Sequence, residues 1–359
     1  MRLTRQKKTG TVVGLDIEAG SIAATEVESN GSVRVTGSAI VPLAPGTFHE
    51  GEVIDSDSLA EALKALFAEH KLAKQVRLGV GNQRVVVRTV RLPAIEDQKE
   101  MEAAVRFQAQ EQMPMPLDQA VLEHQVVGGV PAEEGSTPQL DVVVVAARRD
   151  MVSSFLTPLR RAGLEPVGVD LSAFGMIRAL AGNGEEAAET GAEQRPSATV
   201  LYCSVGDVTN LAVARGRGCL FTRVSHAGLE AISARLAGTR GLDAEHATQW
   251  LQHVGLEQPI EEIEGDAETV AETRRALEDG VSALIDELRL SLDYYGAQES
   301  ATPVERIILC GPGSTIAGMA AQMESLGLPI AVSRPPALAG LDDVSAARLT
   351  LPYGLALES

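Results

Sequence analysis

The chain has 359 residues, of which 45% are apolar and only 3% aromatic, and its 31 basic and 49 acidic residues give a net charge of −18. A chain of this length can form two domains of ordinary size with aliphatic cores. The acidic balance argues against nucleic-acid binding and against broad contact with anionic lipid. The exception is a basic tail over residues 1–10, which we interpret as a solubilising terminus in preference to a membrane contact.

Neither a membrane span nor a secretion signal is visible in the sequence. No segment reaches the ~20 apolar residues that a spanning helix needs. The basic start runs into a predicted strand and not into an apolar helix. Cys203, Cys219 and Cys310 are isolated and odd in number, which favours buried thiols in a reducing compartment over a disulfide or metal site. We therefore expect a cytoplasmic protein.

The first half opens with alternating apolar residues that predict three strands, up to residue 17, over 22–27 and over 33–41. Residues 42–56 are rich in proline and glycine and predict a loop. A helix follows over 57–71, with Asp57 as its capping residue and leucines on one face. A short buried strand over 76–80 ends this part of the chain.

From residue 84 the pattern changes to strand, helix, strand, strand and helix, which predicts a compact inserted α+β unit. The expected elements are a strand over 84–93, a helix over 97–112, antiparallel strands over 121–127 and 140–147, and a helix over 150–162. Met101, Met113 and Met115 line this unit, and they fit either core filling or an adaptable apolar groove for a peptide. A strand over 165–170 and a helix over 171–180 follow, and then a flexible acidic linker over 181–197.

The second half repeats the first in outline. Strands are expected over 199–204, 209–214 and 219–224, helices over 228–238, 243–253 and 267–298, a strand over 307–309, a helix over 315–326, a strand over 329–332 and a last element over 351–357. Three antiparallel strands that open both halves are the outline of a duplicated ribonuclease-H-like domain.

The strand ending at Asp16 is followed by a tight turn of small residues and a second strand. Such a turn presents backbone N–H groups that can cradle an anion, and the Asp can hold Mg²⁺ through water. A plain hairpin with a solvated Asp would look the same. Related stretches at Gly206–Asp207 and at Gly311–Ser314 strengthen the anion-binding interpretation.

Several ordered motifs resemble the actin-like ATPase superfamily and, within it, the PilM family of type IV pilus assembly, related to the division protein FtsA. They are residues 111–117 (EQMPMPL), 146–148 (AAR), 162–164 (AGL), 169–170 (VD), 287–295 (ELRLSLDYY) and 353–357 (YGLAL). The resemblance covers nearly the whole chain. It implies an α/β, duplicated ribonuclease-H-like fold with two lobes around a nucleotide cleft and an inserted subdomain.

The resemblance also implies domain limits and roles for individual residues. The first lobe takes residues 11–83, 165–180 and 338–359, the insert takes 84–164 and the second lobe 198–337. Asp16 falls at the metal-binding position, and Asp16 and Asp170 at the catalytic ones, although Asp170 also suits a helix N-cap. The phosphate and adenosine loops map onto Gly20, Ser21, Gly206, Asp207, Thr209, Asn210, Gly311, Gly313 and Ser314. Asp207 fits either a turn residue or a substitute acid.

The sequence departs from the family pattern where ATP and Mg²⁺ would bind. Glu18 replaces a phosphate-loop glycine and brings negative charge towards the phosphates. The other departures are Ala23 for a lysine, Ser204 for an aspartate, Pro312 for a glycine, and Thr248 and Leu251 for the residues that reach ribose and base. Each lost charge-assisted contact costs ~1.5–3 kcal/mol, so ATP binding is expected to be weakened or lost.

The resemblance implies a scaffold on the inner-membrane platform that assembles type IV pili. Its partner would be a PilN-like membrane protein, whose N-terminal cytoplasmic peptide would lie in a groove between the insert and the first half, near Met101, Met113 and Met115. The protein would then sit at the inner face of the membrane through that partner. The alternative is a slow Mg-ATPase whose nucleotide state gates assembly. A sugar-kinase relative fits less well, because no catalytic-base loop precedes the second phosphate loop.

Overall fold

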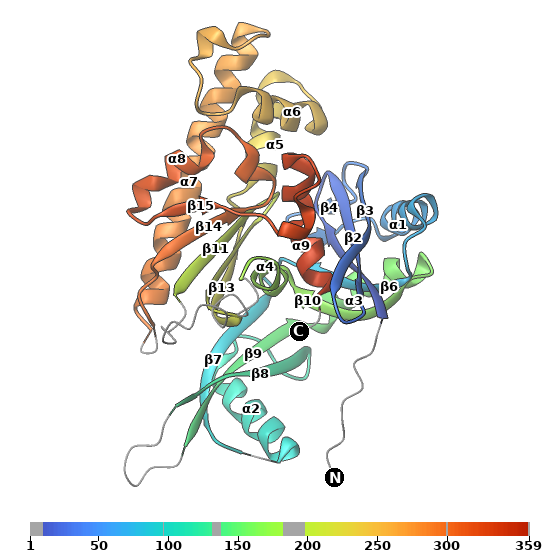
Figure 1. Cartoon of the computed structure of the whole chain (residues 1–359), viewed down its shortest axis with the longest axis vertical. Coiled ribbons are helices and arrows are strands. Elements are labelled where there is room, and N and C mark those ends of the chain that lie inside the picture. Colours follow the sequence, from blue (N-terminus) through green and yellow to red (C-terminus); the bar gives the residue numbers. More distant parts are fainter. Residues whose placement is uncertain (1–9, 96, 131–137, 182–197, 299–300, 358–359) are drawn as a thin grey trace.

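The computed structural model describes residues 10–95, 97–130, 138–181, 198–298 and 301–357. The predicted basic tail, except Gly10, and the predicted acidic linker, except Ala181, lie outside these residues. The described chain forms two sheet-based lobes side by side and a smaller unit below them, the insert (Figure 1). This arrangement confirms the predicted α/β architecture.

The first lobe is built on a five-stranded sheet in the order β10-β6-β1-β2-β3. Its strands are β1 (Gly10–Ile17), β2 (Ser21–Ser29), β3 (Val33–Pro42), β6 (Gln75–Val80) and β10 (Glu165–Leu171). β1 to β3 are antiparallel, and β6 and β10 run parallel to β1. Because side chains alternate along a strand, Val13, Leu15 and Ile17 all pack on α1 (Ser56–His70) and α3 (Arg149–Arg161).

The second lobe repeats this topology in the order β13-β12-β11-β14-β15. Its strands are β11 (Thr199–Val205), β12 (Thr209–Arg215), β13 (Gly218–Ser225), β14 (Arg306–Cys310) and β15 (Ile330–Val332). One face is covered by α5 (Leu229–Arg240), α6 (Ala244–Val254), the long α7 (Ala267–Gly296) and α8 (Met319–Met323). Three antiparallel strands followed by two parallel ones in each lobe confirm the duplication.

Two helices, α4 (Ser172–Leu180) and α9 (Asp343–Ala356), lie where the lobes meet (Figure 1). α9 packs on β1 and β2 of the first lobe. α4 and Leu351 of α9 also share a buried core with β11, β12 and β14 of the second lobe. This buried core joins the two lobes.

The insert is a three-stranded antiparallel sheet, β7-β9-β8, with one helix against it. Its elements are β7 (Val85–Pro93), α2 (Gln98–Gln112), β8 (Ala120–Val130) and β9 (Gln139–Arg148). Met101 and Met113 are 6% and 7% exposed and fill this core, with Met115 packed beside them. The groove interpretation of these methionines is therefore wrong for the first two, because apolar neighbours on the sheet already cover them.

Other local expectations also need correction. Residues 42–56 contain a small hairpin, β4 (Phe48–His49) and β5 (Glu52–Val53). Asp55, not Asp57, caps α1, because its carboxylate accepts from the N–H groups of residues 57 and 58. The helix expected over 315–326 is three short pieces, η3 (Pro312–Thr315), α8 and η4 (Glu324–Leu326), since Gly318 has a positive φ of 81°.

The helix α3 was predicted to belong to the insert, but it packs elsewhere. Met151, Phe155 and Leu159 enter the core of the first lobe beside α1, and none of them joins the core of the insert. Their spacing of four residues places them on one face of α3, and this face packs against the sheet of the first lobe. We therefore take β7 to β9, residues 85–148, as the insert.

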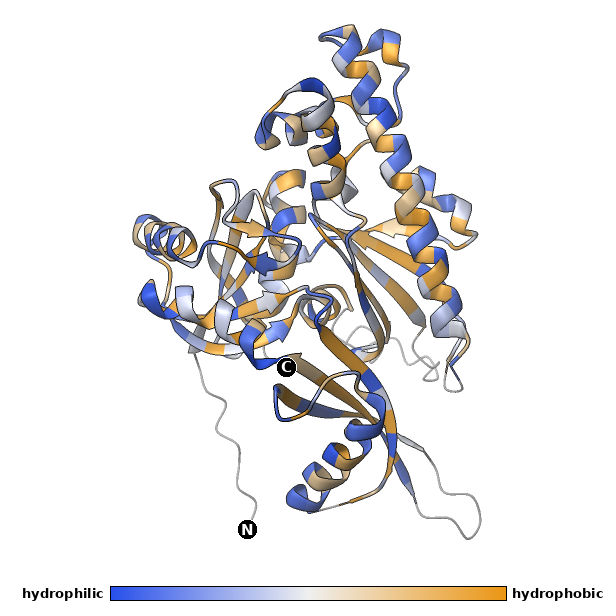
Figure 2. Ribbon diagram, turned by 180° about the vertical axis from the view of Figure 1, so that it is seen from behind, coloured by the Kyte–Doolittle hydropathy of each residue, from blue (hydrophilic) through white to orange (hydrophobic). Residues whose placement is uncertain are grey.

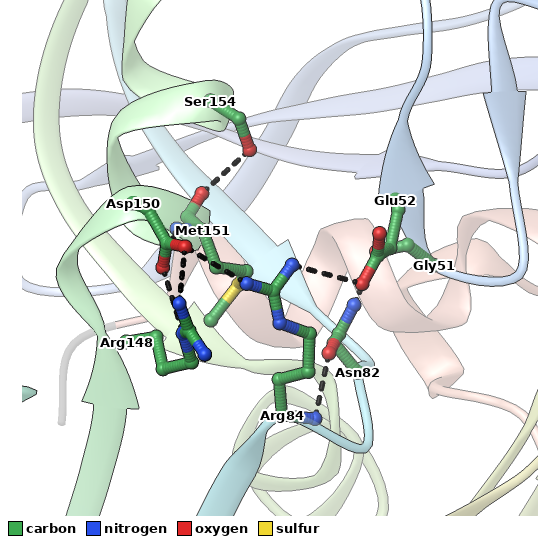
Figure 3. A network of polar contacts seen from close by, with 8 residues as sticks. All are labelled: Gly51, Glu52, Asn82, Arg84, Arg148, Asp150, Met151 and Ser154. Carbon is green, nitrogen blue, oxygen red and sulfur yellow. Dashed lines mark hydrogen bonds and ion pairs between the residues drawn. The ribbon is translucent and has the colours of Figure 1, made fainter. Parts of the chain in front are cut away.

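A polar network ties the insert to the first lobe (Figure 3). Arg84 forms ion pairs with Glu52 of β5 at 3.1 Å and with Asp150 at 3.0 Å, and Arg148 pairs with Asp150 at 2.7 Å. Asn82 donates to the carbonyl of Gly51 at 2.9 Å. The two chain segments that enter and leave the insert therefore meet at Asp150.

Figure 2 shows apolar residues concentrated on the strands, and hydrophilic residues spread along the exposed helices. Within the described residues, no helix is both long and apolar enough to cross a membrane. Even α7, with 30 residues, is amphipathic, since Leu277, Leu284 and Leu288 face the core while many acidic and basic residues are exposed.

Candidate functional site

The turns that follow β1 and β11 face each other across the junction of the lobes. The backbone N–H of Ala19 in the first turn donates to the Asp207 carboxylate at 2.6 Å. In return, the backbone N–H of Asp207 donates to the Glu18 carboxylate at 3.3 Å. A Cβ atom on Gly206 would lie 2.1 Å from Oε1 of Glu18, so the second turn is in close contact with this side chain.

Arg348 of α9 lies behind the first turn and is only 6% exposed. Its guanidinium donates to Asp16 at 2.5 Å and to the Ser21 hydroxyl at 3.0 Å, and it forms an ion pair with Glu18 at 3.0 Å. The predicted metal ligand Asp16 is therefore buried and paired with an internal cation. A buried carboxylate needs such a partner, because an unpaired charge loses its hydration without compensation.

The carboxylates in the turns have unusual protonation equilibria. Burial raises the pKa of Glu18 to about 8, with Arg348 opposing the shift and Asp207 and Asp16 adding to it. Burial also raises the pKa of Asp207 to about 6, and the nearby Glu230 adds to that shift. Carboxyl groups are thus crowded at this point, and burial together with their neighbours opposes their simultaneous ionisation.

A second set of polar contacts joins the lobes beside the turns. His49 of the β4–β5 hairpin lies 2.6 Å from Glu230 in the first turn of α5, and the N–H of Glu50 donates to Glu230 at 3.1 Å. His226 lies 3.3 Å from Glu50. The hydrogen bond to Glu230 raises the pKa of His49. The hairpin, which the sequence analysis took for a loop, thus contacts the second lobe.

The space left between the two turns is small. A cavity of about 20 Å³ is lined by Asp16, Glu18, Asp207, Asn210 and Glu230, among others. That volume suffices for about one water molecule, which needs about 10–15 Å³ by this measure. Pockets for drug-sized ligands are about 300–1,000 Å³. The cavity between the turns is therefore far smaller than a pocket of that size.

The third glycine stretch lies at the end of β14. Gly311 has a φ of 78°, and its carbonyl accepts from the Ser314 hydroxyl at 2.7 Å; Gly313 follows in η3. Gln252 of α6 lies against this loop, donating to the carbonyl of Pro312 at 3.3 Å and accepting from Thr315 at 3.1 Å. Its neighbour Leu251 is buried, so it is Gln252 that contacts the loop.

The remaining predicted site residues are placed as follows. Asp170 pairs with Arg178 at 2.5 Å and does not line the small cavity between the turns. It does not cap α4 either, since Leu171 is the N-cap and makes no side-chain cap bond. Thr209 donates to the carbonyl of Ala227 at 2.6 Å. Gly20 ends the first turn, and Ser21 is held by Arg348.

A larger pocket of about 370 Å³ lies where the insert meets both lobes. Its walls are β7 and β13, each an edge strand of its sheet, and α7 adds Tyr294, which is 53% exposed. A hydrogen bond from Thr89 to the carbonyl of Leu220 bridges the two strands, and Gln83, just before β7, donates to the carbonyl of Val224. We refer to this site as the edge-strand pocket.

The edge-strand pocket has polar groups that can meet a ligand. Asn210 is 6% exposed, lines the pocket, and its Oδ1 atom accepts no hydrogen bond within the described residues. Arg88 donates to the carbonyl of Val87, and no carboxylate in the described part of the chain pairs with it. The lining contains arginines and no acidic residue.

Sequence reasoning missed Arg348, Gln252 and Glu230. Arg348 did leave a signal, because it is the only charged residue between positions 344 and 357. A single charge in an apolar helix needs a buried partner, although the sequence could not name Asp16, 332 positions away. Gln252 and Glu230 stand in ordinary polar surroundings and left no such signal.

A family model described as type IV pilus assembly protein PilM matches residues 14–349. The chain belongs to this family. A solved structure titled as a PilM–PilN type IV pilus biogenesis complex contains a chain that is 26% identical, with a TM-score of 0.77. The match covers 97% of the present chain and 98% of that one. The predicted family is therefore confirmed.

More distant structures share the fold. The ethanolamine utilization protein EutJ from Carboxydothermus hydrogenoformans is 14% identical with a TM-score of 0.54, and the match covers 97% of the present chain and 89% of EutJ. MreB5 of Spiroplasma citri bound to AMPPNP is 13% identical with a TM-score of 0.51, covering 97% and 95% of the two chains. These likenesses support the duplicated, actin-like architecture of this PilM-family member.

Proposed function

We propose that this chain is a cytoplasmic scaffold of the type IV pilus assembly platform and binds the N-terminal peptide of a PilN-like membrane protein. The proposal rests on the PilM family match and on the similarity to a chain from a PilM–PilN complex. The chain would then be held at the inner face of the membrane through this partner.

The observation that carries the proposal is the edge-strand pocket. An extended peptide between β7 and β13 could pair with unpaired backbone groups of either strand. Arg88, which lines the pocket, would donate to a carbonyl of the peptide. The partner peptide would thus bind beside Tyr294 and not beside the methionines of the insert.

The test uses a fluorescent synthetic peptide with the N-terminal cytoplasmic sequence of the PilN-like protein. We expect binding in the tens of micromolar range or tighter, about −6 kcal/mol, measured by fluorescence anisotropy. Tyr294→Ala should weaken it by about tenfold, as removal of a contacting aromatic side chain commonly does. Phe107→Ala is the matched control, because Phe107 is 66% exposed on α2 and lies outside the pocket.

Absence of binding by the wild-type chain would overturn the proposed function. Binding that is lost in Phe107→Ala but kept in Tyr294→Ala would support the proposed partner. It would show, however, that the peptide does not bind in the edge-strand pocket. Arg88→Ala is a second test of the same pocket, because it removes a hydrogen-bond donor from the pocket lining without changing a core residue. It should also weaken binding of the peptide.

We further propose that the nucleotide cleft of this chain is degenerate. The residues between the turns do not fit ATP and Mg²⁺, because Asp16 is already paired with Arg348 and Glu18 fills the space beside Gly206. The 20 Å³ cavity and the contacts of Gln252 with the third loop support the same conclusion.

Thermal unfolding with and without Mg-ATP tests this part. A ligand at 100 times its Kd adds ~2.7 kcal/mol to stability. We expect no shift in the melting temperature at millimolar Mg-ATP. A clear upward shift would instead favour the alternative, a slow Mg-ATPase whose nucleotide state gates assembly.

A further inference from the structure

The turns after β1 and β11 are bound to each other through carboxylates. Glu18 accepts the backbone N–H of Asp207, and Asp207 accepts the backbone N–H of Ala19. Backbone N–H groups of such turns are anion-binding groups. The N–H groups of each turn are therefore already occupied by a carboxyl side chain of the opposite lobe.

We propose that Glu18 and Asp207 act as internal substitutes for a phosphate group, and that their exchange of hydrogen bonds keeps the two lobes closed without any ligand. This goes beyond the loss of nucleotide binding. It gives a role in conformation to Glu18, which departs from the family pattern, and to Asp207 in the second turn.

Arg348 is the positioning residue of this clasp. It contacts Glu18 at 3.0 Å and Asp16 at 2.5 Å, and it is itself buried. Without it, Asp16 and Glu18 would repel each other and Asp207 at close range. The guanidinium thus supplies from within the chain the positive charge that three neighbouring acids require.

The position of the clasp explains how two hydrogen bonds could control the lobes. The apolar core around α4 also joins the lobes, and its Leu351 lines the small cavity between the turns. Near the turns, the other polar contacts across the junction include His49 with Glu230 and His226 with Glu50. The junction on this side is therefore closed mainly by polar contacts, which a small change can release.

Hydrogen–deuterium exchange of the full-length protein tests the clasp directly. Glu18→Ala should speed exchange at the Asp207 amide, and Asp207→Ala should speed it at the Ala19 amide, each by about tenfold, as loss of one hydrogen bond implies. Small-angle scattering should show a larger radius of gyration for both variants. The radius of gyration of the double variant should be only slightly larger than that of either single variant, because the two hydrogen bonds act together.

Conservative variants keep the test valid if an alanine variant does not fold. Glu18→Gln and Asp207→Asn retain an acceptor oxygen, so both should keep the turn amides protected. Glu245→Ala removes an exposed acid from α6 and should change neither measurement.

Unchanged exchange in both alanine variants would overturn the proposal. Faster exchange with an unchanged radius of gyration would overturn the role in lobe closure. Added Mg-ATP that protects the turns of the wild-type protein further would also overturn it, because a phosphate could then displace the carboxylates.

Discussion

Arg348 is the residue on which the charge balance of the lobe junction depends. Its side chain is buried and contacts Asp16, Glu18 and Ser21, and no other ion pair of Asp16 is formed within the described residues. The contribution of such a cation to stability is measured by removing it. Loss of one partner of a buried ion pair leaves the other charge buried and uncompensated.

We expect Arg348→Met to destabilise the protein by about 3–5 kcal/mol, as breaking a buried pair does. Adding Asp16→Asn should recover part of this loss, since the orphaned charge is then removed. Urea unfolding measures both effects. The control is Arg275→Met, whose exposed pair with Glu272 should contribute about 1 kcal/mol or less. Equal losses in the two arginine variants would contradict this account.

The protonation of Glu18 predicts a pH dependence. Its pKa rises from 4.5 in the unfolded chain to about 8 in the folded one, so between these values the folded state binds more protons. Stability therefore falls as the pH rises through this window. The raised pKa of His49 acts in the same direction, because its stabilising contact with Glu230 is lost as the imidazole deprotonates.

Melting temperatures from about pH 5.5 to 8.5 should therefore decline more steeply for the wild-type protein than for Glu18→Gln, which cannot titrate. Differences between the two proteins isolate Glu18 from the other titrating groups. Parallel curves would show that Glu18 does not contribute. The carboxylates with lowered pKa values, such as Asp150, lose their stabilising effect only at more acidic pH and do not interfere.

At the scale of elements, the approach of α9 to β1 brings Arg348 to the junction. Gly14 permits this approach, because a Cβ atom there would lie 1.8 Å from the carbonyl oxygen of Pro352 in α9. Gly354 allows a similarly close contact between α9 and Gly175 of α4. Two glycines thus let α9 pack tightly enough to bury an arginine beside Asp16.

Gly14→Ala should therefore destabilise the protein by at least about 1–3 kcal/mol, the usual range for overpacking a core. The matched control is Gly20→Ala in the same hairpin, because a Cβ atom at that position would meet nothing within 4 Å. Chemical denaturation of both variants checks the difference. Similar stabilities would show that α9 can shift away at little cost.

At the scale of the whole molecule, the insert has a core of its own. Its buried residues come from β7, α2, the segment after α2 and β9, and none of them belongs to the core of the first lobe. Arg84 and Arg148 both pair with Asp150, so the two connections to the insert lie side by side (Figure 3). A short linker can therefore span the gap between them.

Replacing residues 85–148 with a short glycine–serine linker should leave the two lobes folded and remove binding of the partner peptide. Circular dichroism measures whether the lobes remain folded, and fluorescence anisotropy measures binding of the peptide. The clasp between Glu18 and Asp207 lies outside the replaced residues and should persist. Unfolded lobes would show that β7 stabilises the second lobe through its contacts with β13.

The sequence by itself determined the strands and their repeat. Alternation at Val13, Leu15 and Ile17 identifies a buried face, and the glycine turns recur because both halves need a tight reversal after the first strand. The strands of the insert and α2 were likewise predicted from the periodicity of their apolar residues and from the prolines that end the helix. These features are local, so a short window of residues specifies them.

Only the tertiary structure decided what the turns hold. The pairings of Arg348 with Asp16 and of Glu18 with Asp207 join residues 332 and 189 positions apart, and no local pattern encodes such distances. The same holds for Met101 and for α3, whose apolar faces could have served a partner or a core. The packing of the whole chain decides which surface covers an apolar face. It also decides which cation compensates the charge of a buried carboxylate.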